Sequence, residues 1–347
     1  MARKNAESTE YKAFLKAVSD GNPASLYIFH GEEHYLMERY MEKLRTMLIP
    51  DGLEEFNYRR FEGRSLTAAT IVDAVDMLPV FSERTLVEIH DYDIFKAPES
   101  ERKQLTSLFA DIPDYVCLIF IYDTLEFKPD KRLKDTKEIL KNVHEVEFAI
   151  QDGEKITRWV CKHVKEGGKY ISPDDAEYLA FITGGQMTAL NTEIEKLCSY
   201  ATAESITRKD IDTCVIPVTD AVSYKLADAV ARGNHSSAVS ILSDLLRLRE
   251  PPHKILYSLS LTMRQLLWAR LALDAGKNAR YLMDTFNIKY DFQAKNLLSN
   301  ARSMSVDVCK KAVLLCSDTA LALNNGADLE AAMTELIASI CFYRKAV

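Results

Sequence analysis

Residues 25–150 alternate between two kinds of hydrophobic pattern. Short runs that are continuously apolar, or apolar at every second position, are typical of strands. The fourth run is almost entirely apolar, as expected of a central strand in a parallel sheet covered on both faces. The five runs are SLYIFH (25–30), NYRRFEG (57–63), TLVEIHD (85–91), VCLIFIYD (116–123) and VHEVEFAI (143–150).

Helical patterns fill the gaps between these predicted strands. Apolar residues recur there every three or four positions, which places them on one face of a helix. The segments are 36–48, LTAATIVDAVDML (66–78), ERKQLTSLFADI (101–112) and KRLKDTKEILKN (131–142). Five strands that alternate with four helices predict an α/β domain over residues 1–150, with a five-stranded wound parallel sheet.

After residue 150 the strand patterns stop, and local signals predict helices. Ser172 and Pro173 form a helix start, because a serine N-cap is followed by a proline at the first helical position and then by two acidic residues. Gly184 and Gly185 predict the end of that helix. Thr207 is the predicted N-cap of a later one. These signals predict a small helical domain.

The small helical domain is assigned to residues 151–215, and Pro217 and Thr219 are expected in a linker after it. From about Ala221 onwards the pattern is helical throughout, and several segments are apolar almost all round, as in a helical bundle. We therefore predict an all-α third domain over residues 216–347.

The stretch GEEHYLMERY (31–40) follows the first predicted strand and opens a helix, which is the layout of a nucleotide phosphate loop. A working loop needs a second glycine to free backbone N–H groups, a lysine for the phosphate oxygens and a hydroxyl for Mg²⁺. Here only Gly31 is present, and Glu32 and Glu33 stand where phosphate would approach. We expect a degenerate loop that does not bind nucleotide.

The fourth predicted strand ends in Asp123, where an ATPase would place a metal-binding carboxylate. Thr124 follows it instead of the glutamate that would activate water. A strand-end or turn role is therefore the favoured interpretation of Asp123. The sequence predicts no catalytic residue, and it offers no carboxylate pair for nucleotidyl transfer.

Composition narrows the class of protein. The 347 residues are 47% hydrophobic and 27% charged, and no stretch is long and apolar enough to suggest a membrane span. The opening MARKNAESTEY lacks the apolar core of a signal peptide, so a cytoplasmic location is expected. The seven cysteines form no Cys-x-x-Cys pair, and the histidines form no metal-binding pattern. Buried thiols, no metal and no cofactor are the prediction.

Charge is unevenly distributed along the chain. Basic minus acidic residues give −8 for 1–150, −3 for 151–215 and +4 for 216–347. This acidic balance argues against a free-standing DNA-binding protein, because neutralising phosphates needs clustered cations. It leaves open weak or shared contact with DNA inside an assembly.

A short apolar segment, Leu78-Pro79-Val80-Phe81, follows one predicted helix. Proline restricts the residue before it and lacks an N–H, so the helix must end near Pro79 and the apolar residues fall on a projecting turn. Such side chains are candidates for burial by a partner. From the residues alone, the favoured alternative is that Val80 and Phe81 cover the domain's own core.

Several local matches, in this order, resemble the delta subunit of the bacterial DNA polymerase III clamp loader. They include LYIFHGEEHYLMERYMEKL, DMLPVFSERTLVEIHD, ITRWVCKHVKEGGKYISPDDAEYLAFITGG and YKLADAVARGNHSSAVSILSDLL. The resemblance covers about residues 25–275, and the remainder is similar only in its helical character.

The resemblance implies an AAA+ architecture, with a RecA-like domain, a helical lid and a helical collar. It implies a subunit that does not hydrolyse ATP, that binds and opens the beta sliding clamp, and that joins tau/gamma motor subunits and delta-prime in a hetero-pentamer of the replisome. DNA contact would be indirect or weak, and any DNA-directed DNA polymerase activity would belong to the holoenzyme. The clamp-binding element would be Leu78, Pro79, Val80 and Phe81, which reverses the preference stated above.

Two other readings stay open at this point. A divergent ATPase with an unrecognised phosphate loop would bind ATP and Mg²⁺. A delta-prime-like subunit would carry a zinc-binding cysteine cluster and a Ser-Arg-Cys motif, and neither pattern occurs in the sequence.

Overall fold

The computed structural model describes residues 9–63, 66–151 and 153–345. The chain forms two compact units: residues 1–151 are unit 1, and residues 152–347 are unit 2. Most of the opening segment in which no signal peptide was predicted, residues 1–8, lies outside the described residues.

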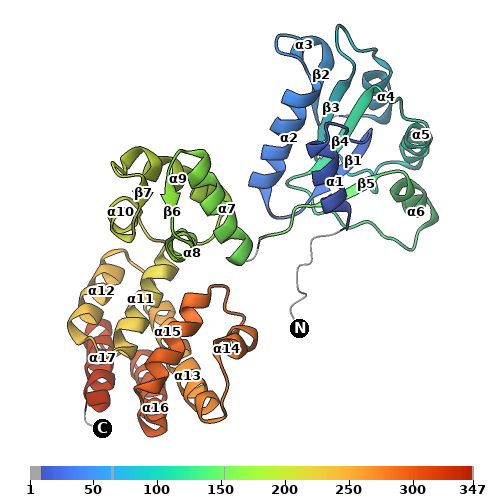
Figure 1. Ribbon diagram of the computed structural model, residues 1–347. Coiled ribbons are helices and arrows are strands. Elements are labelled where there is room, and N and C mark those ends of the chain that lie inside the picture. The colour runs from blue at the N-terminus through green and yellow to red at the C-terminus, as the bar shows by residue number, and fades with distance from the viewer. Residues whose placement is uncertain (1–8, 64–65, 152, 346–347) are drawn as a thin grey trace. The chain divides into compact units, whose positions relative to one another are not determined.

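Unit 1 contains a five-stranded parallel sheet in the order β2-β3-β4-β1-β5 (Figure 1). All five predicted strands are confirmed. All seven residues of the central strand β4 are buried, which explains its continuous apolar sequence. The strands are β1 (Leu26–His30), β2 (Tyr58–Glu62), β3 (Thr85–His90), β4 (Val116–Tyr122) and β5 (His144–Glu147).

Helices cover both faces of this sheet. On one face lie α4 (Ala68–Asp76), α5 (Glu99–Ala110) and α6 (Lys134–Lys141), whose apolar side chains share a core with alternate residues of β1, β3 and β4. On the other face lie α1 (Thr9–Ser19) and α2 (His34–Leu48). The four predicted helices are confirmed, and the predicted α/β class with them.

Aromatic side chains build the core on the face of α1 and α2. Phe14 of α1 packs edge-on against Tyr27 and Phe29 of β1, at ring-centroid distances of 5.3 and 5.0 Å. It also contacts Tyr40 of α2 at 5.4 Å. The helix α1, and the four-residue helix α3 (Glu54–Asn57), were not predicted. A single turn such as α3 is too short for helical periodicity to show.

Unit 2 is built from helices. They are α7 (Gly153–Glu166), α8 (Pro173–Ile182), α9 (Met187–Tyr200), α10 (Arg208–Cys214), α11 (Thr219–Ala231), α12 (His235–Arg247), α13 (Pro252–Asp274), α14 (Ala279–Phe286), α15 (Asp291–Arg302), α16 (Val306–Asn324) and α17 (Leu329–Lys345). One short parallel pair, β6 (Tyr170–Ile171) with β7 (Ser205–Ile206), adds strands that the pattern did not predict.

The predicted helix starts in unit 2 are confirmed. The Ser172 side chain accepts a hydrogen bond from the N–H of Asp175, and Thr207 forms a capping box with Asp210. The expectation that Thr219 lies in a linker is wrong, because α11 begins at Thr219. Its first turn continues directly from an extended residue, Val218, whose N–H is bonded to the carbonyl of Ile182.

Two hydrophobic cores lie within unit 2. One is made by α7 to α10 together with Ala221 and Tyr290, and the other by α11 to α17. Phe181 of α8 packs edge-on against Tyr224 and Tyr290, at 5.1 and 5.8 Å between ring centroids. The first core therefore draws residues from the second helical group, and the boundary at 215/216 stays a prediction.

The described residues contain no membrane-spanning helix and no metal cluster. None of the helices in that part of the chain is long and apolar enough to cross a membrane. No group of three or more His, Cys, Asp or Glu side chains in the same residues is arranged to hold a metal ion. The seven cysteines are free thiols, and Cys117, Cys309, Cys316 and Cys341 are buried.

Candidate functional site

The segment from Gly31 to Glu33, which the sequence predicts to be a degenerate phosphate loop, packs against the backbone of Phe148. Gly31 has a φ of 127°, and a Cβ at this position would lie 2.3 Å from the carbonyl oxygen of Phe148. The same carbonyl accepts a hydrogen bond from the N–H of Glu33 at 2.9 Å, and the N–H of Phe148 is donated to His30 at 2.7 Å. An amide that a phosphate loop would offer to its ligand is thus already used inside unit 1.

Glu33 precedes α2 and is the N-cap residue of that helix, but it makes no side-chain capping bond. It is 8% exposed. Burial raises the pKa of the Glu33 carboxyl above its usual value, and the neighbouring His34 only partly offsets this. A buried carboxyl group at this place narrows the room for an anionic ligand and, when ionised, repels one.

Asp123 follows β4, at the carboxyl edge of the sheet where α/β proteins bind ligands. Its Oδ1 atom lies 2.7 Å from Nδ1 of His34, in the first turn of α2. Both side chains are about half exposed, at 49% and 47%. The Asp123 carboxylate is therefore paired with a histidine.

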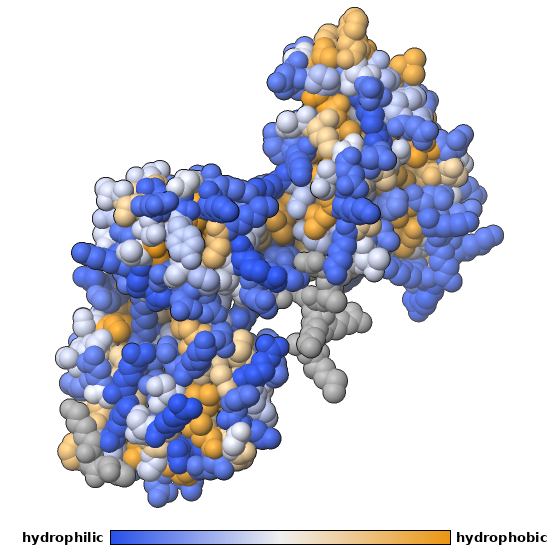
Figure 2. All heavy atoms as spheres, viewed as in Figure 1, coloured by the Kyte–Doolittle hydropathy of each residue, from blue (hydrophilic) through white to orange (hydrophobic). Residues whose placement is uncertain are grey.

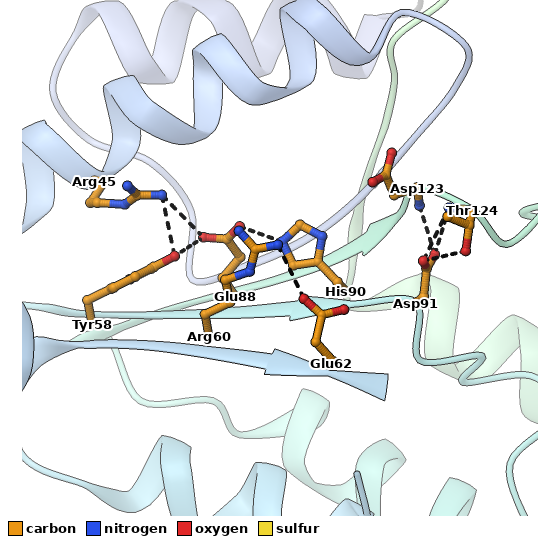
Figure 3. Close-up of polar contacts among 9 residues, drawn as sticks. All are labelled: Arg45, Tyr58, Arg60, Glu62, Glu88, His90, Asp91, Asp123 and Thr124. Atoms are coloured by element: carbon orange, nitrogen blue, oxygen red, sulfur yellow. Dashed lines mark hydrogen bonds and ion pairs between the residues drawn. The ribbon is translucent and has the colours of Figure 1, made fainter. Parts of the chain in front are cut away.

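Asp91, which the sequence did not single out, organises the turn after β4 (Figure 3). Its side chain accepts hydrogen bonds from the backbone N–H groups of Asp123, Thr124 and Leu125, at 2.9 to 3.2 Å, and from the Thr124 hydroxyl at 2.6 Å. Partial burial would raise the pKa of Asp91, but these hydrogen bonds outweigh burial and lower it. The prediction that Asp123 belongs to a turn agrees with this geometry.

The segment Leu78 to Phe81 lies on the surface immediately after α4. Leu78 is 71% exposed, Phe81 is 90% exposed and Val80 is 38% exposed. Phe81 has a φ of 52°, a left-handed conformation that costs a non-glycine residue free energy. The alternative in which Phe81 covers the core of its own domain is wrong, because this ring is almost fully in solvent.

Further apolar side chains lie beside this segment. Met77, directly before Leu78, is 47% exposed, and Phe56 on α3 is 52% exposed. Figure 2 shows hydrophobic atoms gathered at the end of unit 1 where Figure 1 places α3. We call Phe56, Met77, Leu78, Val80 and Phe81 the apolar tip.

A buried polar network lies on β2 and β3, beneath α2 (Figure 3). Glu88, 2% exposed, accepts a hydrogen bond from the Tyr58 hydroxyl at 2.6 Å and lies 2.5 Å from Nε2 of His90. Arg45 of α2 donates to the Tyr58 oxygen at 3.3 Å. The network ties the edge strand β2, which follows α3, to its neighbour and to α2.

Hydrogen bonds in this network favour the ionised form of the Glu88 carboxyl, which burial alone would disfavour. Burial would raise the pKa of Glu88, but the hydrogen bonds with His90 and Tyr58 outweigh it, and the pKa of Glu88 lies below its usual value. For Tyr58, burial and the Glu88 carboxylate raise the pKa to about 12. Glu88 is therefore ionised and Tyr58 neutral at physiological pH.

Unit 2 carries an exposed apolar stripe on α13. Tyr257 (61% exposed), Leu261 (37%), Trp268 (48%) and Leu271 (47%) follow the spacing of one helix face. Trp268 is therefore not a fully buried core residue, since about half of it is in solvent. We call these four residues the α13 stripe.

Asn57 contacts the apolar tip, and the sequence did not single it out. The sequence predicts the first residue of a strand here, but Asn57 ends α3, is 1% exposed, and its side chain is bonded to the backbone of Val80. The only local signal is an asparagine, a residue that readily bonds backbone groups, at a junction between elements. Its partner is 23 residues away, which no local pattern reports.

Comparison with known proteins identifies relatives of both units. The sequence model of the family described as DNA polymerase III, delta subunit, matches residues 27–149. The model of the DNA polymerase III delta subunit, C-terminal domain, matches residues 220–339.

Individual proteins match over most of the chain. DNA polymerase III subunit delta of Bacillus subtilis (strain 168) is 22% identical over 296 residues, which is 84% of this chain and 85% of that protein. A protein of Aquifex aeolicus (strain VF5) named for the same subunit is 23% identical over 297 residues, with 83% of each chain covered. The solved Bacillus subtilis DNA clamp loader delta protein superposes with a TM-score of 0.52 at 20% identity, over 96% of this chain and 99% of that one.

Proposed function

The chain belongs to the DNA polymerase III delta subunit family, and on that premise we propose that it is a clamp-loader subunit that binds the beta sliding clamp and opens it. The solved relative is named as a DNA clamp loader delta protein. The opened clamp would then be placed on primed DNA by the whole assembly.

One observation carries the proposal: the apolar tip exposes a phenylalanine that its own domain leaves uncovered. Phe81 at 90% and Leu78 at 71% exposure are held at the end of a short turn, with Val80 between them. Buried aromatic anchors in a partner's pocket commonly contribute about 2 kcal/mol or more each to binding. A phenylalanine and a leucine together are enough to dominate a small interface with the clamp.

The α13 stripe supports a second part of the proposal, which concerns the partner subunits. Exposed apolar stripes on a helix mark surfaces that another helix covers. On α16, which packs beside α13, Leu314 (57% exposed) and Leu321 (59%) follow one another at two turns' spacing. We assign this face to packing against the motor subunits and delta-prime in a hetero-pentamer.

Nucleotide has no role in the proposed activity of this chain. The Glu33 amide is bonded to Phe148, and Asp123 is paired with His34. In the proposal, the fold of an ATPase is kept as a scaffold for the apolar tip, and ATP acts through the motor subunits. A divergent ATPase would need the phosphate loop that this backbone fills.

The proposal is tested by calorimetry of the purified chain with the sliding clamp in the absence of nucleotide. The wild type is expected to bind, and the double variant Leu78→Ala with Phe81→Ala is expected to bind at least tenfold more weakly. Leu133→Ala removes another leucine of unit 1 that is 57% exposed, and serves as the matched control. Equal affinity of the double variant and the wild type would remove the apolar tip from the proposal.

A further inference from the structure

We propose that Asn57 is the positioning residue of the apolar tip: its side-chain amide holds Val80 by both backbone groups and so presets the geometry in which Leu78 and Phe81 meet the clamp. The inference rests on the proposed function, because it assigns to the tip the role described above. It adds a residue that makes no contact with the partner itself.

The contact between Asn57 and Val80 is reciprocal. Nδ2 of Asn57 donates to the Val80 carbonyl oxygen at 2.9 Å, and the N–H of Val80 donates to Oδ1 of Asn57 at 2.7 Å. The amide thus pairs with one residue of the turn as a neighbouring strand would. Nδ2 also donates to the carbonyl of Leu53 at 3.3 Å, which fixes the amide to α3.

Other ties of this turn are few. In the described part of the chain, residues 78–83 make no hydrogen bond from backbone to backbone. Beyond Asn57, the Ser82 hydroxyl donates to the carbonyl of Arg84 at 3.0 Å and lies 3.4 Å from that of Leu48. Of Asn57 and Ser82, only Asn57 bonds to the middle of the turn, at Val80 between Leu78 and Phe81.

The energetics make Asn57 more than a filler of space. Asn57 is 1% exposed, and its contact with Val80 is partly buried, so truncation would remove the partner of two backbone groups at a cost in free energy. The turn also contains Phe81 at a φ of 52°, a conformation that persists only where the surroundings hold it. Without the amide, the turn would populate other conformations.

Loss of this geometry lowers affinity without loss of any contacting side chain. If only a fraction of molecules has the competent turn, the apparent Kd rises by the inverse of that fraction. A turn that is competent in one molecule in ten gives about a tenfold weaker complex. In the wild type, the hydrogen bond from Asn57 to the Leu53 carbonyl fixes the amide that holds the turn.

The test compares Asn57→Ala with the wild type in three measurements. Calorimetry with the sliding clamp is expected to show about tenfold weaker binding. Amide hydrogen exchange is expected to be faster at Val80, and circular dichroism is expected to show a folded chain. Asn300→Ala is the matched control, since Asn300 is 8% exposed in unit 2 and donates to Asp228 at 2.9 Å; it should leave clamp binding unchanged.

Two further variants test the positioning role, and the one in the Phe81→Ala background separates it from general stability. Asn57→Asp keeps an acceptor for the N–H of Val80 but turns a carboxylate toward two carbonyl oxygens, so it should behave like Asn57→Ala. In the background of Phe81→Ala, adding Asn57→Ala should weaken binding by less than it does in the wild type, because the main anchor is already gone.

The outcomes distinguish the two proposals. Unchanged clamp affinity of Asn57→Ala, in a protein whose affinity falls with Phe81→Ala, would overturn the positioning role and leave the clamp site standing. Unchanged affinity of Phe81→Ala itself would overturn the clamp site and this inference with it. Equal losses for Asn57→Ala with and without Phe81 would also overturn positioning, because they would show an effect independent of the anchor.

Discussion

Nδ1 of His34 lies 2.7 Å from Oδ1 of Asp123, which joins the first turn of α2 to the end of β4. In a nucleotide-hydrolysing relative of this fold, these two places would hold the phosphate loop and the metal-binding carboxylate. In this chain the side chains of His34 and Asp123, each about half exposed, pair with each other. Beside this pair, the N–H of Glu33 is bonded to the carbonyl of Phe148.

These contacts predict that ATP with Mg²⁺ does not bind. Calorimetry of the wild-type chain at millimolar nucleotide is expected to show no binding heat, because the Glu33 amide is bonded to Phe148 and Glu33 repels phosphate. The variant Glu33→Lys with His34→Ala should also show none, since the Phe148 carbonyl still fills the loop. A saturable binding heat on titration of the wild type with ATP and Mg²⁺ would contradict this prediction and favour a divergent ATPase.

Glu88 gives unit 1 a defined sensitivity to acid. Its pKa is lowered in the fold, so the ionised form stabilises the folded state above the usual value of 4.5, and this contribution is lost as the pH falls below 4.5. Glu88→Gln removes the ionisable group and should cost about 1 to 3 kcal/mol at pH 7.

The measurement for Glu88 is thermal unfolding followed by circular dichroism at several values of pH. The gap in Tm between the wild type and Glu88→Gln should be widest at pH 7 and should narrow below 4.5, where the wild-type carboxylate takes up its proton. Glu62→Gln, on the exposed strand edge, is the control and should shift Tm little. A gap that stays constant with pH would contradict the assignment.

Phe81 should lower the stability of the fold while it strengthens binding to the clamp. Its φ of 52° favours glycine. The free energy of unfolding of Phe81→Gly is therefore expected to exceed that of Phe81→Ala by about 1 kcal/mol. Both variants lose the anchor and should bind the clamp about equally weakly. Urea unfolding of the wild type, Phe81→Gly and Phe81→Ala measures stability, and calorimetry of the same proteins with the clamp measures binding. A less stable glycine variant would show that the left-handed turn is not retained.

The α13 stripe predicts that assembly with the partner subunits can be lost without loss of clamp binding. Trp268→Ala with Leu271→Ala should weaken association with the partner subunits at least tenfold, while clamp binding by the isolated chain stays unchanged. Gel filtration of mixtures with the motor subunits and delta-prime measures the first effect. Tyr200→Ala, 52% exposed on α9, is the control. Assembly that survives the double variant would move the interface to another face.

Much of the fold could be read from local patterns, for reasons that particular residues show. The apolar run of β4 identified a buried strand because both of its faces are covered. Ser172 and Thr207 identified helix starts because an N-cap bond joins residues three positions apart. The helix α3 and the strands β6 and β7 escaped because two to four residues contain no period.

The sequence by itself determined that a phosphate loop lacks its lysine and second glycine, and that Pro79 ends a helix beside apolar residues. Only the tertiary structure decided that Phe81 faces solvent, since exposure depends on what the rest of the chain leaves uncovered. Only the tertiary structure brought Asn57 to Val80 and His34 to Asp123, because contacts between residues far apart in the chain follow from the packing of whole elements.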